Sequence, residues 1–245
     1  KTEPVPENLS AYYKSESYIS HTDASKSFTE KLYNIVKTYM LQKKVGWILK
    51  EKSAGKLLDI GAGTGDFLKA ASRYFKVEGV EPSKVAREKA QKKHIRLKKE
   101  LSEISDKYNI ITMWHVLEHV PNLEQQFKEF HRLLNDDGLL VIAVPNYKSK
   151  DADIYKEYWA AYDVPRHLWH FSKKGIQTLF FENGFQLFHS KGLKFDSFYV
   201  SMLSENHRAD KQNLFKAFKN GLKSNLSAAR SGEYSSMVYF FKKTS

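Results

Sequence analysis

Short apolar runs alternate with amphipathic segments along the central part of the chain. Apolar runs typical of buried strands cover residues 56–59, 77–81, 108–114 and 139–144. Between the first two, residues 66–75 place their apolar side chains on one helical face, as a helix that lies on a sheet requires. The members of that face are Phe67, Leu68, Ala71 and Phe75. The pattern predicts strands that alternate with helices.

The rest of the chain carries both kinds of signal. Ser172 is a favourable N-cap and Gly184 a favourable helix stop, so a helix is predicted between them. A strand is expected at 185–195 and a closing strand at 233–242, where β-forming residues are concentrated. Residues 25–52 have a helical pattern.

Length and composition indicate one sizeable domain. The 245 residues are 41% hydrophobic, with six prolines, no internal repeat and no low-complexity linker. No run approaches the roughly 20 apolar residues of a membrane span, and no signal-peptide pattern is present. The sequence contains no cysteine, which suits a cytoplasmic enzyme. We therefore expect a soluble, cytoplasmic protein.

The formal net charge of +12, from 40 basic and 28 acidic residues, is compatible with a nucleic-acid partner. Most lysines, however, fall on solvent-type helix faces at 84–99 and 211–223, and not in a dense block interleaved with aromatic residues. A solvated basic surface is the favoured interpretation. Acidic small molecules and lipid headgroups stay open as partners.

The most informative motif lies where the first predicted strand ends. Asp59 is followed by Gly61, Gly63 and Gly65 directly before the helical pattern. Glycines accept positive φ and let the backbone approach a ligand, with the N–H groups of the next helix facing it. A dinucleotide fingerprint would need a glycine where Asp66 stands. The motif therefore indicates a different cofactor.

Three further landmarks follow in order. Glu81 ends the second strand, twenty residues after Gly61, where nucleotide-binding α/β folds place the acid that binds ribose hydroxyls. The strand 108–114 runs into His115, and the turn 136–138 leads into a strand. Together these features over residues 56–146 resemble the class I S-adenosylmethionine-dependent methyltransferases.

The resemblance implies a Rossmann-like, doubly wound α/β fold. Its sheet would have seven strands, mostly parallel with an antiparallel C-terminal strand, and helices on both faces. Residues 1–52 would be a helical segment that covers the cofactor, and 53–245 the methyltransferase domain, with 147–171 as an acceptor-site insertion and 196–230 as a helical excursion. Some relatives carry a Cys-rich zinc module ahead of such a domain; the chain begins at Lys1, so an upstream segment is left open.

The resemblance also assigns residues to S-adenosylmethionine and to its product S-adenosylhomocysteine. Asp59 would organise the glycine loop, Glu81 would hold the ribose, and Trp114 with His115 would border the methionine end. The full expected set of cofactor-binding residues is Tyr18, His21, Asp59, Gly61, Ala62, Gly63, Gly65, Glu81, Pro82, Trp114 and His115. The N-terminal tyrosines have an alternative role as core-packing residues. The adenine pocket is expected near Glu100 and Leu101, although the usual acid there is not evident.

The segment 163–172 concentrates titratable and aromatic side chains after the strand at 139–144. Its pattern, Asp-x-Pro-Arg-His-Leu-x-His-Phe, resembles one in bacterial relatives of the ubiquinone-pathway O-methyltransferases, where its position suggests an acceptor-site lid. A histidine near its ordinary pKa could take a proton from an acceptor hydroxyl. The catalytic candidates are Arg166, His167 and His170. The alternative is structural: an Asp163–Arg166 pair and histidines that tie the loop to the core.

His115, Glu118 and His119 match the inverted zinc-protease motif H-x-x-E-H. That chemistry needs a continuous helix and a third ligand, whereas this segment directly follows a strand. Related quinone-pathway enzymes carry E-x-x-E-H here and can use a divalent metal, but His115 replaces the first glutamate. We therefore expect no metal site.

The sequence predicts an enzyme that transfers a methyl group from S-adenosylmethionine to a small-molecule acceptor, on oxygen, carbon or nitrogen. One alternative is an RNA or transfer-RNA methyltransferase that uses the basic surface. Another is a non-catalytic relative that only binds the cofactor. The acceptor and the oligomeric state stay open.

Overall fold

The computed structural model describes residues 1–3, 12, 28–208 and 213–244. The chain forms two compact units. We call Asn8–Trp114 with Glu124–Val141 the glycine-loop unit, and Lys1–Glu7 with His115–Leu123 and Ile142–Ser245 the C-terminal unit. The division expected from the sequence, between residues 52 and 53, stays a prediction.

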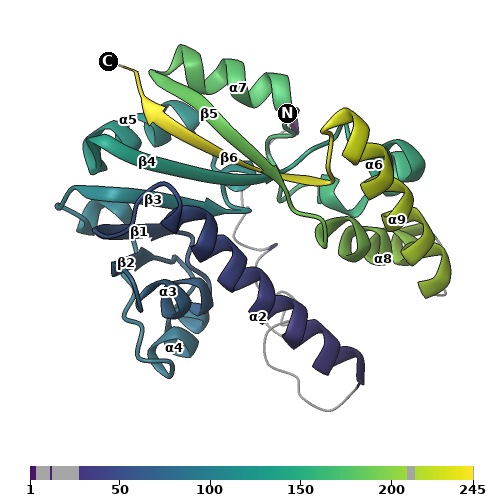
Figure 1. The fold of residues 1–245 in the computed structure, drawn as a ribbon, viewed down its shortest axis with the longest axis horizontal. Coiled ribbons are helices and arrows are strands. Elements are labelled where there is room, and N and C mark those ends of the chain that lie inside the picture. Colours follow the sequence, from purple (N-terminus) through teal and green to yellow (C-terminus); the bar gives the residue numbers. More distant parts are fainter. Residues whose placement is uncertain (4–11, 13–27, 209–212, 245) are drawn as a thin grey trace. The chain divides into compact units, whose positions relative to one another are not determined.

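One mixed sheet of six strands contains all the strands of the described residues (Figure 1). They are β1 Lys56–Ile60, β2 Lys76–Val80, β3 Tyr108–Trp114, β4 Leu134–Pro145, β5 Phe185–Gly192 and β6 Ser236–Lys243, in the order β2-β1-β3-β4-β6-β5. β1 is parallel to β2 and β3, and β5 is antiparallel to β6. The predicted fold class, an α/β Rossmann-like sheet with an antiparallel C-terminal end, is confirmed.

The sheet has six strands where the resemblance implied seven. Next to β2, the chain makes a single parallel bridge between Val80 and Lys98. Lys98 N–H donates to Gly79 O at 2.9 Å, and Glu81 N–H donates to Lys98 O at 3.0 Å. The segment around Lys98 is mostly charged, so it lacks the apolar side chains that a buried strand needs. It turns instead into the 3-10 helix Leu101–Glu103.

Four helices accompany β1 to β4: α2 Phe28–Leu49, α3 Asp66–Ala71, α4 Lys84–Gln91 and α5 Leu123–Leu133. α3 buries Phe67, Leu68 and Ala71, the face that the sequence predicts. Ser83 caps α4, because its side chain accepts a hydrogen bond from the backbone N–H of Ala86. α3 and α4 thus begin directly after β1 and β2, beside the strand ends that carry the glycines and Glu81.

The C-terminal unit contains α6 Lys150–Tyr155, α7 Lys173–Glu182, α8 Asp196–Arg208 and α9 Leu214–Ser231. It also has the 3-10 helices Leu117–His119, Lys156–Tyr158 and Ala160–Tyr162. The predicted helix between Ser172 and Gly184 is confirmed as α7, with Ser172 as its N-cap. Phe180 of α7 stacks on Phe241 of β6 at 4.0 Å between ring centroids, which packs this helix on the sheet. No helix among the described residues is both long and apolar enough to cross a membrane.

Candidate functional site

The loop of residues 61–65, which we call the glycine loop, joins β1 to α3 in a left-handed backbone conformation. Its glycines have φ values of 75° at Gly61, 53° at Gly63 and 76° at Gly65. Side chains with a Cβ rarely adopt such values. The N–H groups of Gly61 and Ala62 both donate to Val80 O, at 2.8 and 3.0 Å. The loop is therefore anchored on the end of β2, and its conformation explains the three glycines.

Space is open beside the middle of this loop. A Cβ atom added at Gly63 would meet no heavy atom within 4 Å, whereas one added at Gly65 would approach Ala90 and Ile95 at 3.1 and 3.2 Å. Gly65 is thus required for packing against α4, and Gly63 is not. An open glycine at the N-terminal side of a helix is the arrangement that lets a ligand come close to the backbone.

Glu81 lies against the glycine loop. Its two carboxylate oxygens accept hydrogen bonds from Gly63 N–H at 2.9 Å and from Ser83 N–H at 2.8 Å. Arg87 Nη1 donates to the carbonyl oxygens of Glu81 and Pro82, each at 2.7 Å. Each carboxylate oxygen can accept a further hydrogen bond. The geometry fixes the position of an acid next to the open glycine.

Asp59 is buried beneath this loop at the end of β1. Its Oδ1 accepts a hydrogen bond of 2.6 Å from the Thr112 hydroxyl of β3. Burial raises the pKa of the Asp59 carboxyl to about 7, although the Thr112 hydrogen bond and the charge of Lys44 oppose this shift. The side chain thus holds a proton through much of the acid and neutral range.

Trp114, at the end of β3, has two neighbours within the glycine-loop unit. Phe67 meets it edge to face at 5.2 Å between ring centroids, and Lys44 Nζ lies 4.3 Å from the ring centroid. Its indole N–H is buried and has no hydrogen-bond partner among the described residues. An orphaned buried donor is uncommon, and it marks Trp114 as a residue that could donate to a bound molecule.

The next residue, His115, belongs to the C-terminal unit and has φ of 57°. Its Nε2 lies 3.2 Å from Asp196 of α8, and its Nδ1 lies 3.5 Å from Glu118. Burial opposes the charged imidazole, but the hydrogen bonds to Asp196 and Glu118 outweigh it and raise the pKa of His115 to about 9. His115 is therefore a cation between two carboxylates at neutral pH.

Hydrogen bonds join the segment 163–171 to the turn 117–120, with backbone carbonyl oxygens of both segments as acceptors. The N–H groups of Leu168 and Trp169 both donate to Glu118 O, at 2.8 and 3.2 Å. The indole N–H of Trp169 donates to Val120 O at 2.7 Å, and His119 Nδ1 lies 3.1 Å from Arg166 O. Most of these contacts use backbone atoms, so they constrain the path of the segment.

The three catalytic candidates of this segment also make local contacts. Arg166 forms the expected pair with Asp163, with Nε and Nη2 at 3.0 and 2.6 Å from Oδ1. His167 is buried with Nδ1 at 2.8 Å from Ala161 O, and His170 has Nε2 at 3.0 Å from Tyr162 O. Burial lowers the pKa of His167 to about 4, so it is neutral at pH 7. Catalytic roles for these residues stay predictions.

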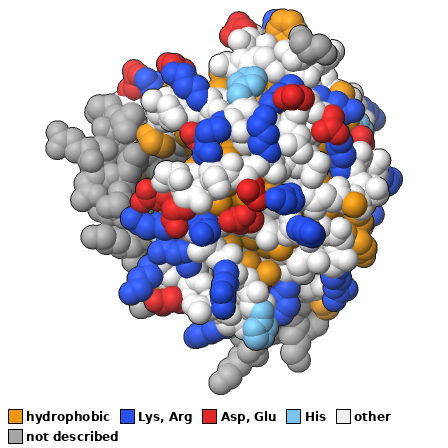
Figure 2. All heavy atoms as spheres, turned by 90° about the vertical axis from the view of Figure 1, so that its left-hand side faces the viewer, with side chains coloured by type: hydrophobic (Ala, Val, Ile, Leu, Met, Phe, Trp, Pro, Cys, Tyr) orange, Lys and Arg blue, Asp and Glu red, His pale blue; other side chains and the backbone are white. Residues whose placement is uncertain are grey.

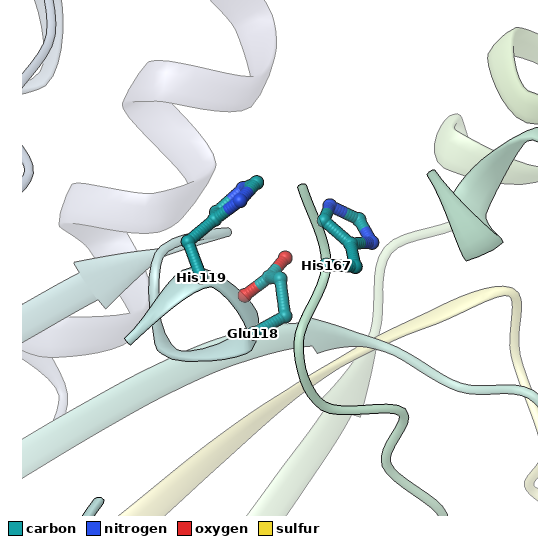
Figure 3. A group of neighbouring side chains, drawn as sticks. All are labelled: Glu118, His119 and His167. Carbon is teal, nitrogen blue, oxygen red and sulfur yellow. The ribbon is translucent and has the colours of Figure 1, made fainter. Parts of the chain in front are cut away.

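Glu118, His119 and His167 gather into one cluster that could hold a metal ion. One ligand atom from each lies within 4.8 Å of the others, and Figure 3 shows the Glu118 carboxylate between the two imidazoles. A carbonyl oxygen near each Nδ1 assigns the ring proton to that nitrogen, which leaves Nε2 as the basic atom. The sequence pattern H-x-x-E-H did not reveal this group, because His167 comes from a distant segment.

The comparisons with known proteins decide the family. A family model described as a methyltransferase domain matches residues 36–190, well over half of the chain. The chain belongs to this methyltransferase family. The predicted resemblance is therefore confirmed.

Within this family, the chain is similar to an uncharacterised protein of Methanocaldococcus jannaschii, 29% identical over 124 residues. It is also similar to a ubiquinone biosynthesis O-methyltransferase of Glaesserella parasuis, 33% identical over 111 residues. These matches cover 49% and 39% of this chain, and 47% of either relative. The chain thus spans about half the length of these relatives.

Solved methyltransferase structures have the same fold. The magnesium protoporphyrin IX methyltransferase of Synechocystis PCC 6803, with bound S-adenosylhomocysteine, superposes with a TM-score of 0.60 at 15% identity, over 97% of this chain and 96% of that one. A cyclopropane synthase of Mycobacterium tuberculosis gives 0.61 at 16% identity, over 99% and 100%. At these identities the likeness establishes the fold.

Most of the residues that the sequence predicts to bind a cofactor lie together in the glycine-loop unit. Tyr18 and His21 lie outside the described residues. The sequence analysis missed Lys44, Thr112 and Asp196, which contact Trp114, Asp59 and His115. None of them belongs to a motif, so only the fold brings them to their partners.

Proposed function

We propose that this protein binds S-adenosylmethionine on the glycine loop and transfers its methyl group to a small-molecule acceptor, within the cytoplasm. The observation that carries the proposal is the open space at Gly63 next to the Glu81 carboxylate. A backbone that a ligand can approach and an acid at hydrogen-bonding distance from that backbone suit a ribose with its attached groups. The family of the chain supports the same chemistry.

The residues of the glycine-loop unit would divide the binding between them. Glu81 would accept hydrogen bonds from ribose hydroxyls, and Trp114 would present its ring and its orphaned N–H to the ligand. Asp59, bonded to Thr112, would hold the loop on β1. The bound sulfonium would supply an already activated methyl group, so the main task of the chain is to align the acceptor and to exclude water.

The C-terminal unit would serve the acceptor. The neutral imidazole of His167 would accept a proton from a hydroxyl, as a weaker base than an exposed histidine because burial lowers its pKa to about 4. Arg166 and His170 lie on the same segment and would orient the acceptor. Loss of the general base should reduce turnover by about 10² to 10⁴, with little change in cofactor affinity.

Calorimetry with S-adenosylhomocysteine tests the cofactor site. We expect Gly63→Val to abolish binding, because valine is strained at φ of 53° and fills the open space. We expect Glu81→Ala to weaken binding by about 1.5–3 kcal/mol, the range for hydrogen bonds to a charged group.

Two control variants match these substitutions. Gly46→Val lies in α2, where an added Cβ also meets nothing within 4 Å, and Glu88→Ala removes an exposed acid of α4. Both should bind like the wild type. Equal affinity of wild type, Gly63→Val and Glu81→Ala, with all three folded by circular dichroism, would refute the proposed site.

A further inference from the structure

The outer surface of α9 carries large apolar side chains. Phe215 is 80% exposed, Phe218 59%, Leu222 43% and Leu226 62%. Their spacing of three and four residues puts them on one face of the helix. A soluble helix normally turns such a face toward the core, so the orientation of α9 is the reverse of the usual one.

The inner face of α9 is made of small and polar residues: Ala217, Asn220, Gly221, Ser224 and Ala228. α8 packs against this face, and the two helices lie side by side in Figure 1. Gly221 permits the close approach, because a Cβ there would come within 3.0 Å of the Cα atom of Phe198. Small residues thus bring the helices together.

Buried hydrogen bonds fix this orientation. Ser224 Oγ donates to Asp151 Oδ1 at 2.6 Å, and Asn220 Nδ2 donates to the Tyr155 hydroxyl at 3.0 Å. Asp151 also accepts from Trp159 and Ser235. A rotation of α9 that buried its phenylalanines would leave these polar groups without partners and would put large rings where Gly221 now lies against α8. The exposed apolar face is therefore a stable property of the fold.

Basic side chains border the apolar face. Lys219 and Lys223 each follow an exposed apolar residue by one position, and Arg230 follows in the last turn. Lys216 is not part of this stripe, because its Nζ pairs with Glu205 of α8 at 3.5 Å. One position along a helix is a rotation of about 100°, so the basic stripe lies directly beside the apolar one. α9 contains no aspartate or glutamate. Both stripes lie on the side of α9 opposite its buried residues.

We propose that α9 is an interfacial helix that binds the surface of an anionic lipid bilayer. Phenylalanine and leucine would enter the boundary between headgroups and acyl chains, while the lysines would contact the headgroup phosphates. A second copy of this chain fits less well, because α9 contains no acidic side chain that could pair with the basic stripe of the other copy. A nucleic-acid duplex would attract the lysines and leave the phenylalanines in water, because its bases are already stacked on one another.

This docking places the enzyme at a membrane surface and is independent of the proposed methyl transfer. Flotation of the full chain with vesicles measures it directly. We expect binding to vesicles of phosphatidylcholine with about one quarter phosphatidylglycerol, little binding to pure phosphatidylcholine, and weaker binding as the salt concentration rises.

Two double variants separate the apolar and electrostatic contributions. Phe215→Ser with Phe218→Ser, and Lys219→Glu with Lys223→Glu, should each reduce the affinity for anionic vesicles by at least about tenfold. Phe181→Ser is the matched control, because Phe181 is 66% exposed on α7, away from this face. It should bind vesicles like the wild type.

Failure of docking and failure of the proposed function can be told apart, since binding of S-adenosylhomocysteine is measured separately on every variant. Absence of vesicle binding by the wild type, or binding by both double variants as tight as that of the wild type, would overturn the proposal. A wild-type dimer by light scattering that the phenylalanine variant converts to a monomer, without any vesicle binding, would instead assign the face to a second copy.

Discussion

Asp59 and Asp66 lie seven positions apart in the glycine-loop unit, yet their surroundings shift their acidities in opposite directions. Burial raises the pKa of Asp59 to about 7. Burial acts in the same sense on Asp66, but ion pairs with Lys37 at 2.7 Å and Lys93 at 2.8 Å outweigh it and lower its pKa. One carboxyl therefore destabilises the fold when it ionises, and the other stabilises it.

The first prediction follows from the linkage of ionisation to folding. Between about pH 4 and 7 the folded protein keeps a proton on Asp59 that the unfolded chain has lost, so the contribution of Asp59 to the free energy of unfolding falls as the pH rises. Asparagine does not ionise, so the Asp59→Asn variant does not lose stability in this way as the pH rises. We expect it to raise the free energy of unfolding at pH 8 by about 2–4 kcal/mol, and to have little effect at pH 4, in urea titrations.

Asp66→Asn is the matched comparison, and its expected effect has the opposite sign. Because the folded state lowers the pKa of Asp66, its ionised carboxyl stabilises the fold at pH values above the ordinary pKa of an aspartate. This stabilisation is lost as the pH falls. The variant should be less stable than the wild type at pH 7. If Asp59→Asn were also destabilising at pH 8, the interpretation of Asp59 as a buried, protonated acid would be wrong.

A second prediction at this scale concerns the cluster of Glu118, His119 and His167. The charge of Glu118 already has a partner, because His115 lies 3.5 Å away and is protonated at neutral pH. A divalent ion bound there would lie close to that imidazolium and be repelled by it. We therefore expect the purified protein to contain no stoichiometric zinc by elemental analysis. About one zinc per chain, absent from a folded His167→Ala variant, would contradict this expectation.

At the scale of elements, glycine has opposite consequences in two helices. Gly221 of α9 lies against the backbone of α8, where a Cβ would meet the Phe198 side chain at 2.7 Å and its backbone N at 3.1 Å. Gly46 of α2 has nothing within 4 Å of the same position. Helix propensity favours alanine at both sites. The difference between the effects of Gly46→Ala and Gly221→Ala on the free energy of unfolding therefore measures the packing of α8 on α9.

We predict that Gly46→Ala raises the free energy of unfolding by about 0.5–1 kcal/mol, the usual gain in a helix interior. Gly221→Ala should lower it by about 1–3 kcal/mol, because backbone atoms of α8 must move to accommodate the methyl group. Thermal unfolding followed by circular dichroism gives both values. A stabilising Gly221→Ala would mean that the two helices are not in close contact in solution.

At the scale of the whole molecule, the excess of basic residues does not form one continuous surface on the face that Figure 2 shows. Lysine and arginine side chains are interspersed with acidic ones there. Several basic side chains of the described residues are paired with acids, as in Lys52–Asp137 and Lys56–Asp106, each at 2.6 Å, and Lys99–Glu100 at 2.8 Å. The face in Figure 2 therefore lacks the continuous basic surface that the RNA alternative requires.

The corresponding prediction is weak binding of nucleic acid. In filter-binding assays at about 0.15 M salt, we expect no specific retention of transfer RNA, because paired charges release few counterions on binding. Addition of S-adenosylhomocysteine should not change this result. Submicromolar binding with a steep dependence on the logarithm of the salt concentration would support the RNA alternative instead.

Local patterns in the sequence determined the elements around the glycine loop. The apolar run at 108–114 predicted β3 with the correct bounds, the run at 56–59 predicted β1 to within one residue, and the three glycines were correctly placed at positive φ. Ser172 and Gly184 delimited α7. These features depend on interactions between neighbouring residues, such as backbone sterics, capping and periodic burial, so they can be inferred without the fold.

Tertiary structure alone decided which distant side chains meet. The approach of His167 to Glu118 and His119, and of Asp196 to His115, depends on how separate segments pack. The same is true of α9, because only its packing on α8 decides which of its faces is buried. Hydrogen bonds from Ser224 and Asn220 to buried groups of other elements hold its small, polar face inward, so its apolar face lies outward. Local sequence contains no record of those partners, because folding alone brings them within reach.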